Sequence, residues 1–150
     1  MLDLHAIKAD PAKLLNGSWW RVWPSPTAVI DGEAVRERPP ETDAAFLIVP
    51  LGVAYERALD KARKPFLHEI RDGKVDDATL RKIQAQALAE AAVPCWQGLT
   101  MGGEVIPYSE AKAVELLADP AWTWLHEFVH RAAQYRAATL ATEEAKAAGN

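Results

Sequence analysis

The segment at residues 94–120 constrains the fold more than any other part of the chain, because its glycines and prolines fix where elements start and stop. Glycine adopts positive φ without a steric penalty, so Gly102 and Gly103 predict a tight turn. The extended run at residues 104–106 ends before Pro107, since proline disfavours helical backbone in the residue before it. A short strand that follows a glycine turn is therefore predicted here.

Four or five helices are predicted after residue 50, mainly because apolar residues recur there at helical spacing. Ser109 and either Asp76 or Asp77 are placed as N-caps, whose side chains accept hydrogen bonds from free backbone amides. The predicted helices lie around residues 55–62, then at 66–71, about 77–93, 110–118 and 122–140. The residues expected to face the core are Leu80, Ile83, Ala87 and Ala91 in the third helix, and Leu125, Phe128, Val129, Ala132 and either Tyr135 or Arg136 in the last.

Two or three strands are predicted before residue 50. Residues 18–23 (SWWRVW) alternate, so that Trp20 points to one face and Trp19 to the other, and both faces are rich in aromatic residues. Residues 27–35 are expected to fold around a turn at Asp31 and Gly32, since Asp-Gly favours the type I′ turn of hairpins. Residues 44–49 (AAFLIV) are the third strand.

This order of elements predicts the α+β class, predominantly α-helical, with a small N-terminal β unit. The 150 residues are expected to form a single domain with its own core. Within it, residues 1–43 are the β-rich part and residues 44–140 the helical body. Residues 141–150 have a helix-forming composition without an apolar face, so we predict a frayed tail.

Composition excludes several classes of protein. The formal net charge of −4 argues against nucleic acid as a partner, since phosphate backbones are bound by basic surfaces. No apolar run reaches the roughly 18–20 residues that span a bilayer, so no membrane partner is expected. The N-terminus lacks the pattern of a secretory signal, which predicts a cytoplasmic protein. The single cysteine, Cys95, excludes an internal disulfide.

The sequence His126-Glu127-Phe128-Val129-His130 matches the H-E-x-x-H pattern of zinc hydrolases. Two histidines four residues apart share one helix face, and the glutamate could activate a metal-bound water. A catalytic zinc needs a third protein ligand, however, and the extended pattern would require a histidine where Arg136 stands. We therefore predict no catalytic residue, metal or cofactor, and interpret both histidines as surface residues beside the core. A zinc-dependent hydrolase that uses this motif is kept as an alternative.

Three segments, taken in order, resemble a family of bacteriophage tail assembly chaperones from long-tailed phages and prophages. The segments are AFLIVPLGVAYERALDKARKPF, GKVDDATLRKIQAQALAEAAVPCWQGL and GGEVIPYSEAKAVELLADPAWTWLHEFVHRAAQ. The resemblance covers residues 43–136, and its most specific parts are WQG at 96–98, IPYS at 106–109 and LLAD at 116–119. The chain departs from the family pattern at residues 50–52 and 135–138.

The resemblance implies a function without an active site. Such proteins bind the tape measure protein, a long helical chain that sets tail length, and keep it soluble until the tail tube assembles around it. The resemblance implies action in the cytoplasm of the bacterial host and absence from the mature virion. The tail-tube protein and a second copy of the chain are further candidate partners, and a structural tail joining or capping protein is the second alternative.

Aromatic residues are the candidates for contact with the partner, since an exposed apolar groove is what a chaperone of amphipathic helices needs. Trp96 is expected in the core. The candidate partner-binding residues are Trp19, Trp20, Trp23, Tyr55, Trp122 and Trp124.

Overall fold

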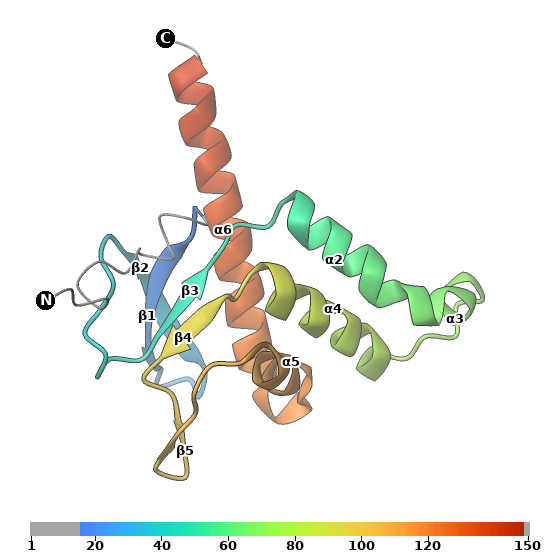
Figure 1. Ribbon diagram of the computed structural model, residues 1–150, viewed down its shortest axis with the longest axis horizontal. Coiled ribbons are helices and arrows are strands. Elements are labelled where there is room, and N and C mark those ends of the chain that lie inside the picture. The colour runs from blue at the N-terminus through green and yellow to red at the C-terminus, as the bar shows by residue number, and fades with distance from the viewer. Residues whose placement is uncertain (1–15, 149–150) are drawn as a thin grey trace, which may run out of the picture.

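The computed structural model describes residues 16–148, which form a small antiparallel sheet backed by helices (Figure 1). The α+β class is therefore confirmed. Residues 1–15 of the predicted β-rich part and the last two residues of the predicted tail lie outside this range. The elements are β1 (Ser18–Pro24), β2 (Ile30–Val35), β3 (Ala45–Ile48), α2 (Val53–Arg63), η1 (Lys64–Phe66), α3 (Leu67–Arg71), α4 (Asp77–Ala91), β4 (Cys95–Gln97), β5 (Thr100–Met101), β6 (Glu104–Val105), α5 (Glu110–Ala118), η2 (Pro120–Trp122) and α6 (Thr123–Ala148).

The main sheet has the strand order β2-β1-β3-β4, and all neighbours are antiparallel. The alternation predicted for β1 is confirmed. Trp20 packs into the large core between sheet and helices, whereas Trp19 packs with Ala45 and Leu47 on the opposite face. The Arg38 guanidinium covers the Trp19 ring at 4.8 Å from its centroid. Both faces are therefore covered at Trp19 and Trp20, whereas Arg21 and Trp23 further along the strand are exposed.

The predicted turn at Asp31 and Gly32 is wrong. Both residues lie inside β2, where Gly32 pairs with Val22 of β1. The turn between the strands comes earlier, where Ser25 donates a backbone hydrogen bond to Val29 at 2.7 Å. Gly32 is needed for packing, since a Cβ there would lie 2.6 Å from the Phe128 ring of α6. The glycine admits the close approach of an aromatic ring to the strand.

The sheet also contains a strand, β4, that was not predicted. It follows Pro94 and pairs with β3, so that Trp96 stands directly opposite Phe46. The next residue, Gln97, is buried and donates from its amide to the backbone carbonyls of Pro39, Pro40 and Asp43 at 2.8–3.2 Å. These bonds tie the loop after β2 to the edge of the sheet. Three residues with a polar one among them give too short a pattern for a strand to be predicted.

The helix starts follow the predicted caps. The Asp76 carboxylate accepts from the Thr79 amide at 2.8 Å, and the Ser109 hydroxyl accepts from the Lys112 amide at 3.0 Å. Asp119 caps η2 in the same way, through the amide of Ala121. The helix α2 buries Tyr55, Ala58, Leu59 and Ala62. Leu80, predicted to face the core, is 43% exposed, because it lies in the first turn of α4.

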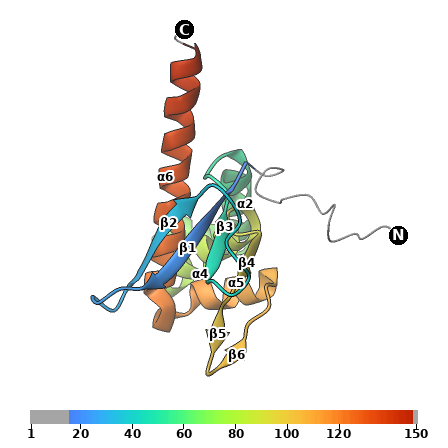
Figure 2. The ribbon, with the colours of Figure 1, turned by 90° about the vertical axis from the view of Figure 1, so that its left-hand side faces the viewer.

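The last helix, α6, runs to Ala148, beyond the predicted end at Leu140. Residues 141–148 (ATEEAKAA) are strong helix formers apart from Thr142, so the backbone stays helical although the sequence has no apolar face. Figures 1 and 2 show this end of α6 projecting past the sheet. The buried stripe is the predicted one up to Ala132 and adds Ala133, whereas Tyr135 is 63% exposed. Tyr135 nevertheless meets the Trp20 ring edge-on at 6.0 Å.

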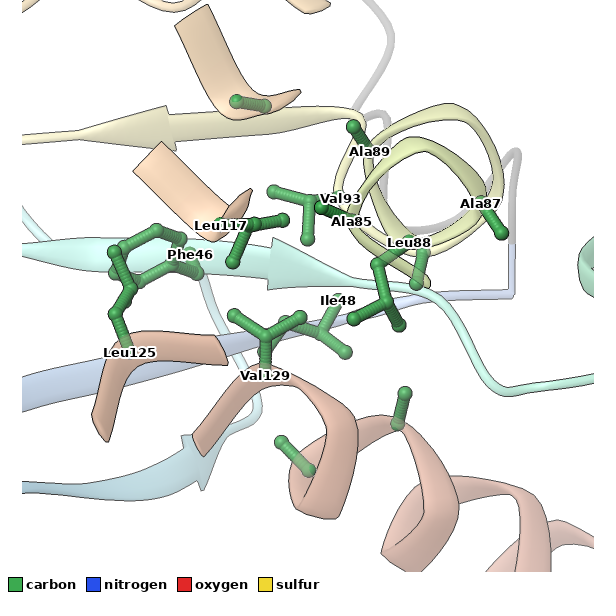
Figure 3. Packing of buried hydrophobic residues seen from close by; sticks show 14 of the residues in the cluster. Phe46, Ile48, Ala85, Ala87, Leu88, Ala89, Val93, Leu117, Leu125 and Val129 are labelled. Atoms are coloured by element: carbon green, nitrogen blue, oxygen red, sulfur yellow. The ribbon is translucent and has the colours of Figure 1, made fainter. Parts of the chain in front are cut away.

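One core joins the sheet to the helices. All four residues of β3 are buried, and Figure 3 shows Phe46 beside Leu117 and Leu125, and Ile48 beside Leu88 and Val129. This strand therefore serves as the centre on which α4, α5 and α6 pack. Within the described residues, no helix combines the length and the apolar character needed to cross a membrane.

Candidate partner-binding groove

The six candidate contact residues separate into two groups. Trp19, Trp20 and Tyr55 are buried and belong to the core. Trp23 is 42% exposed, and Trp122 and Trp124 are half-buried. Only this second group offers surface to a partner, and the structure brings its members to one end of the molecule.

An apolar groove lies at that end, formed by two adjoining hollows of about 370 and 110 Å³ that share Ile30, Leu99 and Trp124. We call the two together the hairpin groove. The larger hollow is lined by Val22, Trp23, Pro24, Ser25, Ala28, Val29, Ile30, Ala44, Leu99 and Trp124. The smaller is lined by Ile30, Phe46, Leu99, Thr100, Met101, Ile106, Leu116, Trp122, Trp124 and Leu125.

Three pieces of local structure build the groove, and Figure 2 shows them at the lower end of the molecule. The β1–β2 hairpin forms one wall, and its tip contains Ala28 with a positive φ of 61°. The β5–β6 hairpin forms another, turning at Gly102 and Gly103 with φ of 59° and 84°. The predicted glycine turn is thus confirmed. Such paired positive φ values are those of a type I′ turn.

The third wall is the junction of η2 and α6. Pro120, with Asp119 as the cap, starts the 3₁₀ turn that ends at Trp122. Trp122 and Trp124 then meet edge-on, with ring centroids 5.7 Å apart. This contact orients the two indole rings towards each other at the groove.

Sequence reasoning missed several apolar residues of the groove, among them Val29, Leu99 and Met101. Val29 and Met101 are well exposed, which is uncommon for large apolar side chains gathered in one place. The sequence held one indication of this exposure: Val29 and Met101 each lie within two residues of a hairpin turn, where a core position is not expected. Single apolar residues beside turns are too common for this signal to predict a groove.

The two histidines of the H-E-x-x-H sequence lie elsewhere, at a separate hollow of about 290 Å³ that Gln84, Glu127 and Arg131 also line. His126 is buried, so its placement as a surface residue is corrected: its Nδ1 is 3.0 Å from the carbonyl oxygen of Leu117. A carbonyl can only accept, so Nδ1 donates and this ring is held by the end of α5. His130 is partly buried against the Tyr55 ring. Desolvation, and then the nearby charge of His126, lower the pKa of His130.

The hollow beside His126 and His130 has few side chains that could bind a metal ion. Among the residues that the structure describes, no group of three or more His, Cys, Asp and Glu side chains is placed to bind one. The guanidinium of Arg131 lines the same hollow and would repel a divalent cation.

Comparison with known proteins places the chain in a prophage-derived class. The YdaY prophage protein family matches residues 51–150, which span everything from the start of α2 onward. The chain belongs to this family. The matched region includes the β5–β6 hairpin and the tryptophans of η2 and α6, whereas the β1–β2 wall of the groove lies outside it. No curated protein and no solved structure gives a significant match.

Proposed function

We propose that this prophage protein is a non-enzymatic tail assembly chaperone, which binds the tape measure protein in the hairpin groove. The observation that carries the proposal is that Trp23, Trp122 and Trp124 gather at one exposed apolar groove. The ordered sequence segments that resemble tail assembly chaperones support it, and so does membership of a prophage family.

A long amphipathic helix exposes an apolar stripe, which aggregates unless another surface covers it. A groove that receives such a helix typically provides aromatic and aliphatic side chains to anchor residues spaced along one helical face. The hairpin groove has this composition, with tryptophan indoles beside Ile30, Leu99 and Met101. Covering a helix needs no catalytic group.

The proposal includes a place and a time of action. The chain acts in the cytoplasm of the bacterial host while the tape measure protein is still unassembled, and it is absent from the mature virion. The tail-tube protein displaces it from the tape measure protein as the tube forms. Self-association of the chain would let several copies cover one long helix.

The test is affinity purification of the tagged chain from cells that express the complete prophage tail gene cluster, followed by mass spectrometry. We expect a long helical tape measure protein to co-purify, and the chain to be missing from finished particles. Trp124→Ala should reduce the recovery of the tape measure protein, because it removes an anchor from both hollows. The matched control is Leu80→Ala, which truncates an exposed apolar residue of α4 that does not line the groove.

Three results would contradict the proposal. Recovery of no tail protein would mean that the groove serves another partner. Retention of the chain in purified particles would indicate the structural joining or capping protein instead. Stoichiometric zinc in untagged protein, lost in His126→Ala, would indicate the hydrolase.

A further inference from the structure

The hairpin groove combines an apolar floor with carboxylates at its margins. Its lining side chains are almost all apolar, whereas two of its exposed lining residues, Trp23 and Met101, each pair with an acidic residue of the neighbouring strand. We infer that the groove selects helical segments in which an apolar stripe is flanked by lysine or arginine. The inference rests on the proposed function only in naming the tape measure protein as the natural source of such a segment.

The first margin is the β5–β6 hairpin. Met101 lines the groove and pairs directly with Glu104 across the hairpin. Residues directly opposite in an antiparallel pair present their side chains on the same face. The exposed carboxylate of Glu104 therefore stands beside the exposed side chain of Met101, at the solvent edge of the groove.

The second margin surrounds Trp23. Asp31 pairs directly with Trp23, and Glu33 pairs with Arg21 one step along the same face. Arg21 makes an ion pair with Asp43, with 3.5 Å between Nε and Oδ2, so its charge is already matched. A further hollow, lined by Glu33, Asp43 and Arg21, continues from Trp23. In the described part of the chain, Arg21 is the only cation among the residues that line these three hollows.

This distribution of charge favours one kind of occupant. A lysine or arginine beside the apolar stripe of a bound helix would meet Glu104 at one margin or Asp31 and Glu33 at the other. The exposed indole of Trp23 adds a ring face that attracts cations. An acidic flank would meet like charges instead, which disfavours binding. Because these carboxylates are exposed, the preference should weaken as salt screens it.

The experiment compares two synthetic helical peptides of equal length that share one stripe of leucine and phenylalanine. One carries lysine on both flanks of the stripe and the other carries glutamate. Binding to the full-length chain is measured by fluorescence anisotropy at about 50 mM and about 500 mM salt. We expect the lysine peptide to bind about tenfold more tightly at low salt, and this ratio to fall to about threefold or less at high salt.

Reversing the charges of the acidic residues tests whether they cause the preference for the lysine peptide. The double variant Asp31→Lys with Glu104→Lys should reduce the low-salt ratio to about threefold or less, because both margins then repel the lysine flanks. The matched control is Glu69→Lys on α3, which Figure 1 shows beyond the far end of α2. It reverses the charge of one exposed residue away from the groove, which is half of the change in net charge made by the double variant, and it should leave the ratio unchanged. Circular dichroism checks that each variant is folded.

Equal affinity for the two peptides, or a preference that survives the double variant, would overturn the inference. The outcome is independent of the purification test of the proposed function. If the tape measure protein co-purifies but the two peptides bind equally, the charge preference is rejected and the chaperone function is supported. If the lysine peptide is preferred in a salt-sensitive way but no tail protein is recovered, the binding site is supported and the tape measure protein is rejected as its partner.

Discussion

Two aromatic regions of this chain differ in how far their tryptophan rings are exposed. Trp96 is 5% exposed, and its indole nitrogen donates to the carbonyl oxygen of Ile106 at 2.9 Å. Its ring meets Phe46 and Tyr108 edge-on, with centroids 6.0 and 5.0 Å away. In the hairpin groove, by contrast, Trp122 and Trp124 meet each other and remain half-buried, and Trp23 is 42% exposed.

The difference follows from the elements that hold the rings. Trp96 sits on the edge strand β4, where the directly opposite residue, Phe46, and Tyr108 pack against its ring. The groove tryptophans sit near the end of a strand, in a 3₁₀ turn and at a helix start, and their rings are only partly covered. A buried aromatic ring with its polar atom paired contributes to stability, whereas a half-exposed ring is available for binding. Four predictions test this distinction, beginning with the largest expected effect.

Trp96→Ala should lower the free energy of unfolding by about 3–5 kcal/mol, because it leaves a large cavity under Phe46 and Tyr108. Urea denaturation followed by circular dichroism measures the change. Trp96→Phe is the graded control, since it keeps a ring but loses the bond to Ile106 and should cost less. A loss below about 1 kcal/mol for the alanine variant would mean that this tryptophan is not part of the stabilising core.

Gly32→Ala should lower the free energy of unfolding by about 1–3 kcal/mol. The added methyl group would lie 2.6 Å from the Phe128 ring and 3.0 Å from the Arg21 carbonyl oxygen, so α6 must move away from β2. Gly52→Ala is the matched control, because nothing lies within 4 Å of its added Cβ. If both variants were equally stable, the contact between α6 and the strand would not depend on this glycine.

Sequence predicted those parts of the fold that are specified by local chemistry. The helix caps and the glycine turn depend on a few adjacent residues. The cap at Ser109 and the turn were predicted correctly, and Asp76 is one of the two caps predicted for α4. Gly32 was misinterpreted because its role depends on Phe128, which is almost 100 residues away in the chain. The Asp-Gly pair has the same local appearance in a turn and in a strand packed under a ring.

The candidate site shows the same limit. Sequence reasoning named all three tryptophans of the groove but could not separate them from the three aromatic residues that are buried. Exposure depends on how the two hairpins and the start of α6 come together, which no local pattern encodes. The pairing of Met101 with Glu104, by contrast, follows from the predicted turn at Gly102 and Gly103 alone.

Trp23→Ala should change the free energy of unfolding by about 1 kcal/mol or less, because the ring is already 42% exposed. The same variant should weaken binding of the lysine-flanked peptide by about tenfold or more, as expected for an aromatic anchor in a groove. Leu80→Ala is matched in exposure, at 43%, and should keep full peptide binding. A large loss of stability in Trp23→Ala would instead assign this residue to the core.

The smallest effect concerns His130, which lies on the covered side of α6 against Tyr55. Burial lowers the pKa of His130 in the folded state, so the neutral imidazole is favoured there. The unfolded chain therefore takes up a proton first: stability is complete above the unfolded pKa of about 6.5 and falls as pH drops through it towards the lowered folded value. Urea midpoints at about pH 7.5 and about pH 5.5, above the range where carboxylates titrate, should thus fall further in the wild type than in His130→Gln. If the urea midpoint fell by the same amount in both proteins, His130 would be as exposed to water as the tryptophans of the groove.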